Sequence, residues 1–199
     1  DDVVLVGVFF FCKQKTAYDY LFGDWSSVVC SSDLVVPYDD LSNQGHDVTA
    51  FFFNPNIHPY SENLRRLDAF LSYTEANHIK VINDESGIEM DDWFREVVFR
   101  ETQRCKVCFN FRINFVARLA ETKGFDAFST TLLYSRFQKH ELLKETCEII
   151  SERYRIPFVY QDWRTGWNEG VKRYRKLGLY RQKYCGCVYS EKERAKKII

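Results

Sequence analysis

From residue 44 to the end of the chain, short apolar stretches alternate with longer segments whose apolar residues recur every three or four positions. The short stretches predict β-strands at 48–53, 79–82, 127–133 and 157–160. The longer segments predict helices at about 61–77, 91–98, 107–123, 138–154 and 166–177. Such alternation is typical of an α/β domain with a mostly parallel sheet. We predict one such domain over residues 35–199, ending in a tail that bears cysteines.

Prolines, glycines and capping residues mark where these elements begin and end. Pro55 and Pro59 follow the first predicted strand and prevent it from continuing. Ser61 is expected to cap the next helix, and Gly124 to end the helix that begins near Val107.

Polar residues follow three of the predicted strands, at 54–58, 129–135 and 162–164. In an open parallel sheet, ligands bind outside the carboxyl ends of the strands. We therefore expect these three segments to converge on one edge of the sheet.

The N-terminal segment does not share this regular pattern. The apolar residues of 12–34 recur with neither a helical nor a strand period. The sequence of this segment resembles a translated sequencing-adapter fragment. We therefore interpret residues 1–34 as an aberrant or foreign segment, in which case the first strand and its loop are partly or wholly replaced.

Composition excludes several classes of protein. The 199 residues contain no apolar run near the roughly 20 residues that cross a bilayer, so no membrane association is predicted. The apolar stretch 3–11 opens with Asp1 and Asp2 rather than with Lys or Arg, which argues against a secretory signal. We expect a soluble, cytoplasmic protein whose cysteines are reduced.

Charge is balanced over the whole chain, with 28 basic and 28 acidic residues, but it is unevenly distributed. Residues 164–199 carry eleven Lys or Arg against three Glu. Such a segment can bind a polyanion such as RNA, although a solvated helix face explains the charge equally well.

Four of the seven cysteines form two close pairs. Cys105 and Cys108 lie one turn apart at the start of a predicted helix, whose dipole favours thiolates, and Cys185 and Cys187 flank a glycine. Four thiolates suit an iron–sulfur cluster or tetrahedral zinc, and a reversible disulfide is a third alternative. The long separation of the pairs is unlike the usual zinc knuckle. Cys147 lies on an apolar helix face and is interpreted as a buried hydrophobic residue.

Several segments match a known family. Residues 45–60 contain the loop Asn-Pro-Asn-Ile-His-Pro, and residues 104–108 contain Cys-Lys-Val-Cys. The other two matching segments are residues 124–133 and residues 178–187, the second of which ends in Tyr-Cys-Gly-Cys. Over residues 44–194 the chain thereby resembles the epoxyqueuosine reductase QueH family.

The resemblance implies an oxidoreductase that removes the epoxide oxygen of epoxyqueuosine in a tRNA anticodon to give queuosine. It also implies a Rossmann-like, HUP-type three-layer fold, a [4Fe–4S] cluster and a second metal ion, iron, beside the cluster. The positions that match family ligands are Cys105, Cys108, Cys185 and Cys187. The implied partners are tRNA and an electron donor of unknown identity.

The chain departs from the family in its first loop, where the family has Cys-Cys-Ala-Pro followed by Asp or Cys. Residues 29–33 align with that motif, so that Cys30 falls on the second cysteine and Asp33 on the final position. By resemblance both are metal ligands, with Cys30 also holding the cluster and Asp33 also catalytic. Val29 replaces the first cysteine. The disrupted loop raises the alternative that this chain is inactive.

Deoxygenation of an epoxide requires two electrons and a group that accepts the oxygen, which a low-potential cluster and an open metal site can provide. Tyr184, Arg181 and His58 are candidates for proton delivery or substrate positioning, although packing or phosphate binding explains each of them equally well.

An unpaired anticodon base is usually held by aromatic stacking and phosphate contacts. The candidate tRNA-binding residues are Arg164, Trp167, Arg173, Arg175 and Lys183.

Two other functions are weighed against the reductase. An ATP-dependent tRNA-thiolation enzyme on a similar fold would need a Gly-rich loop after its first strand, and the sequence contains none. A non-catalytic, zinc-stabilised RNA-binding module would explain the thiols and the basic segment without chemistry.

Overall fold

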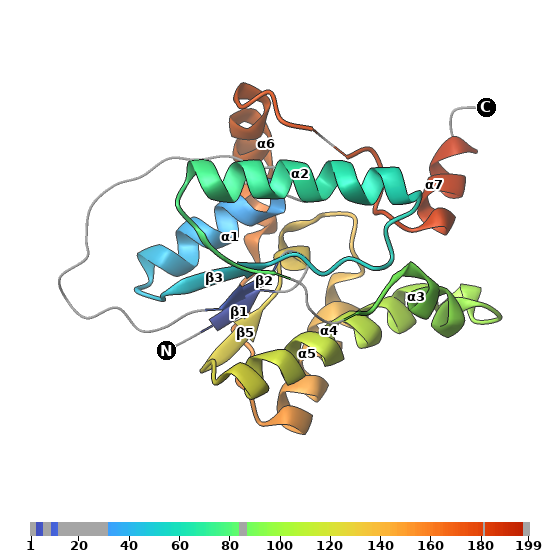
Figure 1. Ribbon diagram of the computed structural model, residues 1–199, viewed down its shortest axis with the longest axis horizontal. Coiled ribbons are helices and arrows are strands. Elements are labelled where there is room, and N and C mark those ends of the chain that lie inside the picture. The colour runs from blue at the N-terminus through green and yellow to red at the C-terminus, as the bar shows by residue number, and fades with distance from the viewer. Residues whose placement is uncertain (1–2, 6–8, 12–31, 84–86, 181, 197–199) are drawn as a thin grey trace.

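The computed structural model describes residues 3–5, 9–11, 32–83, 87–180 and 182–196 (Figure 1). Its strands are β1 (Val3–Leu5), β2 (Phe9–Phe11), β3 (Val48–Phe51), β4 (Lys80–Ile82) and β5 (Ala127–Ser129). Its α-helices are α1 (Ser32–Asn43), α2 (Tyr60–Ala76), α3 (Met90–Val97), α4 (Arg104–Lys123), α5 (His140–Tyr154), α6 (Trp167–Lys176) and α7 (Val188–Ala195). Short 3-10 helices are η1 (Glu101–Gln103), η2 (Thr131–Tyr134) and η3 (Trp163–Gly166). The predicted α/β class is confirmed.

The sheet is mostly parallel, as the sequence predicts. β1 lies between β3 and β5 and runs parallel to both, and β4 is parallel to β3. Among the described strands only β2 is antiparallel, next to β3. Figure 1 shows α2 and α6 on one side of the sheet and α4 and α5 on the other. Because β3 and β5 run in the same direction, their carboxyl ends reach the same edge.

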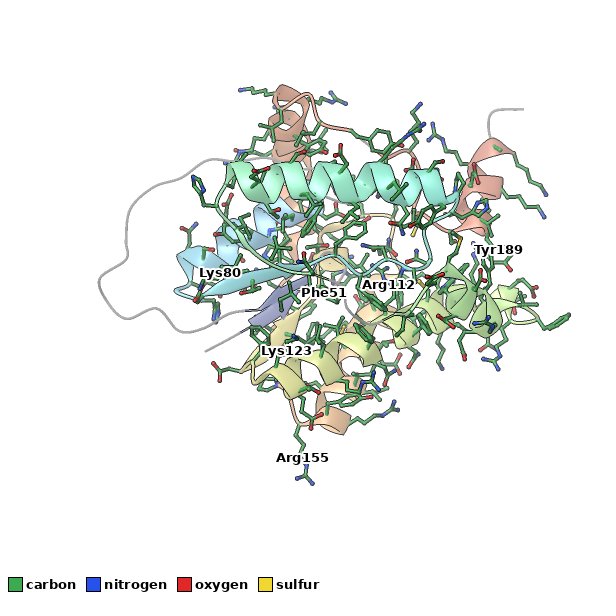
Figure 2. All side chains as sticks on the ribbon, in the orientation of Figure 1. Phe51, Lys80, Arg112, Lys123, Arg155 and Tyr189 are labelled. Carbon is green, nitrogen blue, oxygen red and sulfur yellow. The ribbon has the colours of Figure 1, made fainter. Side chains whose placement is uncertain are left out.

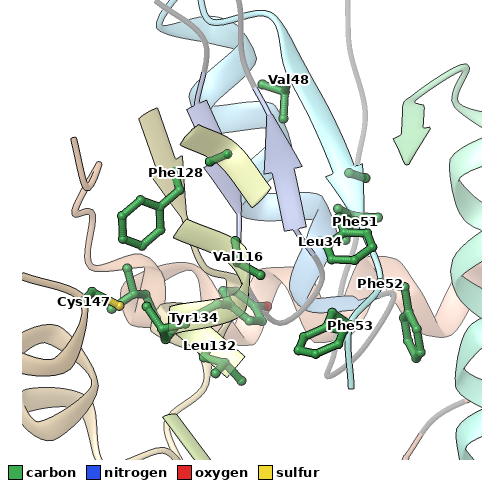
Figure 3. Packing of buried hydrophobic residues seen from close by; sticks show 14 of the residues in the cluster. Leu34, Val48, Phe51, Phe52, Phe53, Val116, Phe128, Leu132, Tyr134 and Cys147 are labelled. Atoms are coloured by element: carbon green, nitrogen blue, oxygen red, sulfur yellow. The ribbon is translucent and has the colours of Figure 1, made fainter. Parts of the chain in front are cut away.

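Three consecutive phenylalanines at the end of β3 tie the sheet to helices on both of its sides. Phe53 stacks on Phe115 of α4 at 4.3 Å between ring centroids, whereas Phe52 packs on Phe70 of α2 at 5.5 Å. Figure 3 shows the rings of Phe51, Phe52 and Phe53 in the core. Side chains alternate between the two faces of an extended segment, so one short stretch contacts both layers. Burial of each ring stabilises the fold by about 1.5–3 kcal/mol.

Cys147 belongs to the same core. It is 0% exposed on α5, beside Leu143 and Ile150 of that helix, which confirms its interpretation as a buried hydrophobic residue. Burial raises the pKa of its thiol well above the ordinary value.

Most predicted elements are present, with shifted ends. α4 ends as expected, because Gly124 adopts φ 71° and its N–H bonds the carbonyl of Ala120. Ser61 is not the cap of α2: that position is Pro59, and no side chain caps it. The strand predicted at 127–133 is wrong beyond Ser129, because the hydroxyl of Thr130 accepts the N–H of Leu132 and starts η2.

The strand predicted at 157–160 is reduced to a single parallel bridge between Phe128 and Phe158. Two helices, α1 and α7, carry no signal that predicts them. α1 contains Pro37, which ordinarily breaks a helix, yet Leu34, Val35 and Leu41 on it are 0% exposed. Tertiary burial of this face outweighs the local cost.

None of the helices in the described ranges combines the length and low charge needed to cross a membrane. Even the 20-residue α4 carries charged side chains along its length.

Candidate metal centre

The two thiol pairs come from elements that dock against each other. Cys105 and Cys108 lie in the first two turns of α4, and Cys185 and Cys187 lie in the turn before α7. Arg104 joins the start of α4 to α7 through an ion pair with Glu193 and a cation–π contact with the ring of Tyr189 at 5.8 Å. All four thiols are free. A separation of 77 positions in sequence is thus closed by helix docking.

The thiols are close enough to affect one another's ionisation. Cys187 raises the pKa of Cys105, Cys108 and Cys185, and Cys185 also raises that of Cys108. Repulsion of this kind places the thiols of the two pairs within electrostatic range of each other.

Burial is nevertheless the largest cause of each shift. It raises the pKa of Cys108 to about 12, against the opposing charge of Arg112. It also raises the pKa of Cys105, against Lys139 and Arg104. The pKa of Cys185 is raised as well, against a hydrogen bond from Gln138, although this residue is exposed at the surface and desolvation acts on it less than on Cys108. Burial therefore outweighs both the nearby cations and the stabilisation of thiolates expected at the start of α4. A bound cationic centre would reverse this balance.

Whether these residues fit a metal group depends on its size. Within the described ranges, no three His, Cys, Asp or Glu side chains converge closely enough to hold a single metal ion. A cubane cluster is wider than one ion and spreads its thiolate ligands over its corners. Four soft thiol donors, two on α4 and two in the turn before α7, fit such a cluster by chemistry.

Arg66 of α2 fixes the backbone that carries Cys185. Its guanidinium donates to the carbonyls of Cys185 and Tyr184, at 3.2 Å each, and lies over the ring of Tyr184 at 5.2 Å. Glu62, one turn earlier, accepts from Nε of Arg66 at 2.8 Å and also from the hydroxyl of Tyr180. Arg66 is 1% and Glu62 4% exposed, so this is a buried ion pair that serves as a clamp.

Gly186 is required between the two cysteines for two reasons. It adopts φ 132°, a conformation that other residues rarely adopt. A Cβ atom there would approach Cγ1 of Ile57 to 3.0 Å and Nη1 of Arg66 to 3.1 Å. The turn can therefore pack against Arg66 and Ile57 only if residue 186 is glycine, which has no Cβ atom.

The loop after β3 closes the other side of this turn. His58 donates its backbone N–H to the carbonyl of Gly186 at 2.8 Å, and its own carbonyl accepts from the hydroxyl of Tyr184. The His58 ring is partly exposed, with Nδ1 3.5 Å from a carboxylate oxygen of Glu191 on α7. Burial raises the pKa of Tyr184 to about 12, so its phenol stays protonated at neutral pH.

Arg112 of α4 lies between the loop after β3 and the thiols (Figure 2). Its guanidinium donates to Oδ1 of Asn54 at 2.5 Å and, in the metal-free protein, hydrogen-bonds Cys108. Two buried atoms of this loop, Nδ2 of Asn54 and Oδ1 of Asn56, have no hydrogen-bond partner within the described residues. Polar atoms of this kind beside the thiols suit a ligand.

Asp33, a predicted ligand and catalytic residue, is buried in the first turn of α1 at 3% exposure. Burial raises its pKa well above the ordinary value, and the charge of Arg66 opposes this rise. Asp33 is thereby linked to the clamp that holds the Cys185 turn. The other predicted ligand of the first loop, Cys30, lies outside the described residues, as does Arg181.

The segments expected at the carboxyl edge of the sheet do converge there. The loop after β3 contacts Gly186, and Gln138, beyond β5, donates to Sγ of Cys185 at 3.3 Å. Arg136 in turn bonds the carbonyl of Arg164 at 3.4 Å. The loop after β3 and the segment after β5 thus both contact this turn, and the segment at 162–164 contacts the second of them.

The candidate tRNA-binding residues divide into two groups. Arg164 and Trp167 lie beside the segment at 134–138, where Trp167 packs on Tyr134 and Phe137. Arg164 is held by Asp162, whose two oxygens it contacts at 2.8 and 2.6 Å, and this pairing lowers the pKa of Asp162 to about 2.

The second group lies on and after α6. Arg173 is paired with Glu169 at 3.4 Å and lines an open groove of the last turns of α6, whereas Arg175 and Lys183 are exposed. Figure 1 shows α6 above α2 and α7 beyond the right-hand end of α2. Arg173 and Arg175 therefore lie away from the thiols, whereas Lys183 lies beside the Cys185 turn, where its carbonyl accepts from Arg194 of α7 at 2.6 Å.

Sequence patterns alone did not identify the residues that position the centre: Glu62, Arg66, Arg112 and Gln138. A signal for the first two exists, because they are charged residues spaced i,i+4 on the helix face that also carries Phe70 and Tyr73. Charged residues within an apolar stripe indicate a buried pair. Gln138 has no comparable signal.

The chain matches the family described as epoxyqueuosine reductase QueH over residues 27–193. It is 35% identical over 151 residues to the epoxyqueuosine reductase QueH of Dehalococcoides mccartyi, covering 76% of this chain and 82% of the relative. For the Thermotoga maritima protein of the same name the identity is 33% over 180 residues, covering 85% and 91%.

The Acinetobacter baylyi protein of that name is 32% identical over 170 residues, covering 81% of this chain and 75% of the relative. The family match begins at residue 27, inside the segment 1–34 that its irregular pattern sets apart, and it includes both thiol pairs. Similarity of this extent, over a fold that joins the two pairs, leads to one conclusion: the chain belongs to the epoxyqueuosine reductase QueH family.

Proposed function

We propose that this chain reduces epoxyqueuosine in a tRNA anticodon to queuosine, using an iron–sulfur cluster held by four cysteines. The ligands are Cys105, Cys108, Cys185 and Cys187. The observation that carries the proposal is the meeting of these two distant thiol pairs at the carboxyl edge of the sheet, in a chain that belongs to this family.

The reaction is balanced by two electrons and two protons. The epoxide loses its oxygen as water, and a carbon–carbon double bond forms between the two ring carbons. Both electrons come from an external donor. When bound, a [4Fe–4S] cluster supplies electrons one at a time, and a second metal ion, iron, supplies a Lewis acid for the oxygen.

Residues of the chain hold and shield this chemistry. Tyr184 retains its phenolic proton at neutral pH and is aimed at the His58 carbonyl, which makes it a candidate proton donor that a substrate can redirect. Asp33, buried beside the clamp, is the candidate ligand for the second metal, together with Cys30. Arg66 and Gly186 keep the Cys185 turn in place.

Three finer features belong to the same proposal. Helices on both sides of a mostly parallel sheet support a HUP-type, Rossmann-like domain. A tRNA substrate and reduced, free cysteines support a cytoplasmic location. The altered first loop, with Val29 in place of the first cysteine of the motif, is expected to lower activity.

Metal analysis is the first test. The protein is purified without oxygen, reconstituted, and assayed for iron, sulfide and visible absorption. Wild type and the control Cys147→Ala, which alters a buried core thiol, should hold equal iron and sulfide, whereas Cys185→Ala should lose most of both. Zinc in place of iron would instead indicate an RNA-binding module, and it would overturn the reductase.

Turnover is the second test. The chain and a variant with its first loop restored by Val29→Cys, Ser31→Ala and Ser32→Pro are each incubated with epoxyqueuosine-containing tRNA and dithionite. Mass spectrometry of the nucleosides should show queuosine from the restored variant and less from the original chain. Iron-loaded restored protein that forms no queuosine would contradict the proposed function.

A further inference from the structure

Phe137 is an aromatic side chain left in water beside the candidate metal centre. It lies between η2 and α5 and is 83% exposed. The next residue, Gln138, donates to Sγ of Cys185 at 3.3 Å, so the segment that carries the ring contacts the turn that bears two of the thiols. A single exposed apolar residue is common, but its position at the reactive edge of the sheet is informative.

The ring is held in place rather than free to swing. The backbone N–H of Phe137 donates to Oγ of Ser135, which is itself buried. Trp167 meets the ring edge-on at 5.6 Å and is braced by Tyr134, with centroids 5.2 Å apart. Because Tyr134 is 0% exposed, the aromatic row extends from the core to the surface. Such a preorganised ring loses little entropy when a flat ligand stacks on it.

The charge around Phe137 suits an anionic ligand. Arg136 and Lys139 flank it in sequence and are both exposed, and Lys139 is near enough to Cys105 to lower the pKa of that thiol. Arg164 is neutralised by Asp162, and Glu141 in the first turn of α5 offsets part of the remaining charge. The segment from Arg136 to Lys139 itself carries two cations and no acid.

From these contacts we infer that Phe137 is the stacking platform for an unpaired base of the anticodon loop, with Arg136 and Lys139 contacting the adjoining phosphates. This inference rests on the proposed function and identifies the residues that present the tRNA to the thiol centre. An aromatic ring flanked by cations is how proteins hold single-stranded nucleic acid. Docking of a protein electron donor would need a larger continuous apolar surface than one ring.

The test compares variants of Phe137 with Phe99→Ala as a matched control. Phe99 is also an exposed phenylalanine, at 93%, but it lies in the turn after α3. Binding of an epoxyqueuosine-containing anticodon stem-loop is measured by fluorescence anisotropy at fixed salt. Phe137→Ala should weaken it about 5- to 150-fold, which corresponds to the 1–3 kcal/mol of one base stack. Phe137→Trp should bind at least as well as wild type.

Phe137→Leu separates stacking from simple apolar contact, since leucine keeps apolar area without a π-face. It should bind as weakly as Phe137→Ala, while iron content and the rate of cluster reduction by dithionite stay at wild-type levels. Arg136→Gln with Lys139→Gln should reduce the slope of log affinity against log salt by about 1.4, at about 0.7 for each phosphate contact to a single strand.

Two results would overturn the inference. One is wild-type binding by Phe137→Ala and Phe137→Leu. The other is a Phe137 variant that binds RNA like wild type and turns over more slowly only when a protein electron donor replaces dithionite. That result would show that the ring contacts the electron donor instead of the RNA. Because binding is measured without turnover, a failure of the proposed reaction is distinguished from a failure of this platform.

Discussion

Replacement of Arg66 by methionine removes the clamp on the Cys185 turn while keeping most of the side-chain volume. In the folded protein the guanidinium donates to Glu62 and to the carbonyls of Tyr184 and Cys185. Methionine makes none of these bonds. The substitution leaves the carboxylate of Glu62 buried without its cation and leaves two carbonyls without a charged donor.

The expected cost is large. Loss of one partner from a buried ion pair destabilises a protein by about 3–5 kcal/mol, a large part of the 5–15 kcal/mol that holds a domain folded. The neighbouring Arg65→Met is a matched control, because Arg65 is exposed and contacts Tyr180 through a cation–π contact at 5.9 Å and a side-chain hydrogen bond. An exposed cation–π contact is worth about 0.5–1 kcal/mol.

The free energy of unfolding is measured by urea denaturation of the metal-free protein, and iron retention is measured on reconstituted samples. Arg66→Met should lose at least about 2 kcal/mol more than Arg65→Met and should release iron faster. Glu62→Gln combined with Arg66→Met should be more stable than the sum of the single losses predicts, because no buried charge remains. If Arg66→Met matches Arg65→Met, or if the two losses simply add, the clamp is not an energetic unit.

Two further predictions concern the thiol site, and a third concerns α6. Gly186→Ala should lower the iron content, because the added Cβ would meet side chains at 3.0 and 3.1 Å. The control Gly45→Ala should not lower it, because Gly45 also has a positive φ, 92°, but has open space around it. Equal iron content in both variants would contradict the steric argument. Burial raises the pKa of Cys108 from 9.0 to about 12. At pH 8 the thiolate fraction of Cys108 in metal-free protein should therefore be about a thousandfold smaller than that of an ordinary cysteine. Its alkylation by iodoacetamide should therefore rise steeply as the pH approaches 12 and become ordinary in urea, and rapid labelling at pH 8 without urea would refute the burial of this thiol. Arg173→Ala with Arg175→Ala should weaken tRNA binding and flatten its salt dependence, and an unchanged salt slope would remove α6 from the RNA surface.

The helices and strands that follow simple periods were predictable. α4 and α5 repeat apolar residues at helical spacing, and Gly124 ends α4 where a left-handed residue is needed. The elements that were missed depend on distant partners. α1 tolerates Pro37 because its apolar face is buried, and the region 157–160 forms only a bridge because β5 ends at Ser129.

The candidate site shows the same division. The spacing of the two cysteine pairs indicated a metal centre, and the resemblance to one family indicated which reaction it serves. Neither indicated that the turn of Cys185 is held by Arg66, which lies on a helix 119 residues earlier in the sequence. Neither singled out Phe137, because nothing in the sequence distinguishes it from the other phenylalanines among the 17 in the chain. Its exposure in the structure distinguishes it.

The sequence by itself determined which residue types this protein has for chemistry, and in what local order, because periodicity, caps and motifs are properties of neighbouring residues. Only the tertiary structure decided which of these residues meet. Docking of α7 on α4 brings the thiol-bearing segments together, and burial then raises the pKa of the Cys108 thiol to about 12. Proximity and desolvation arise from contacts between distant segments, and no local pattern encodes them.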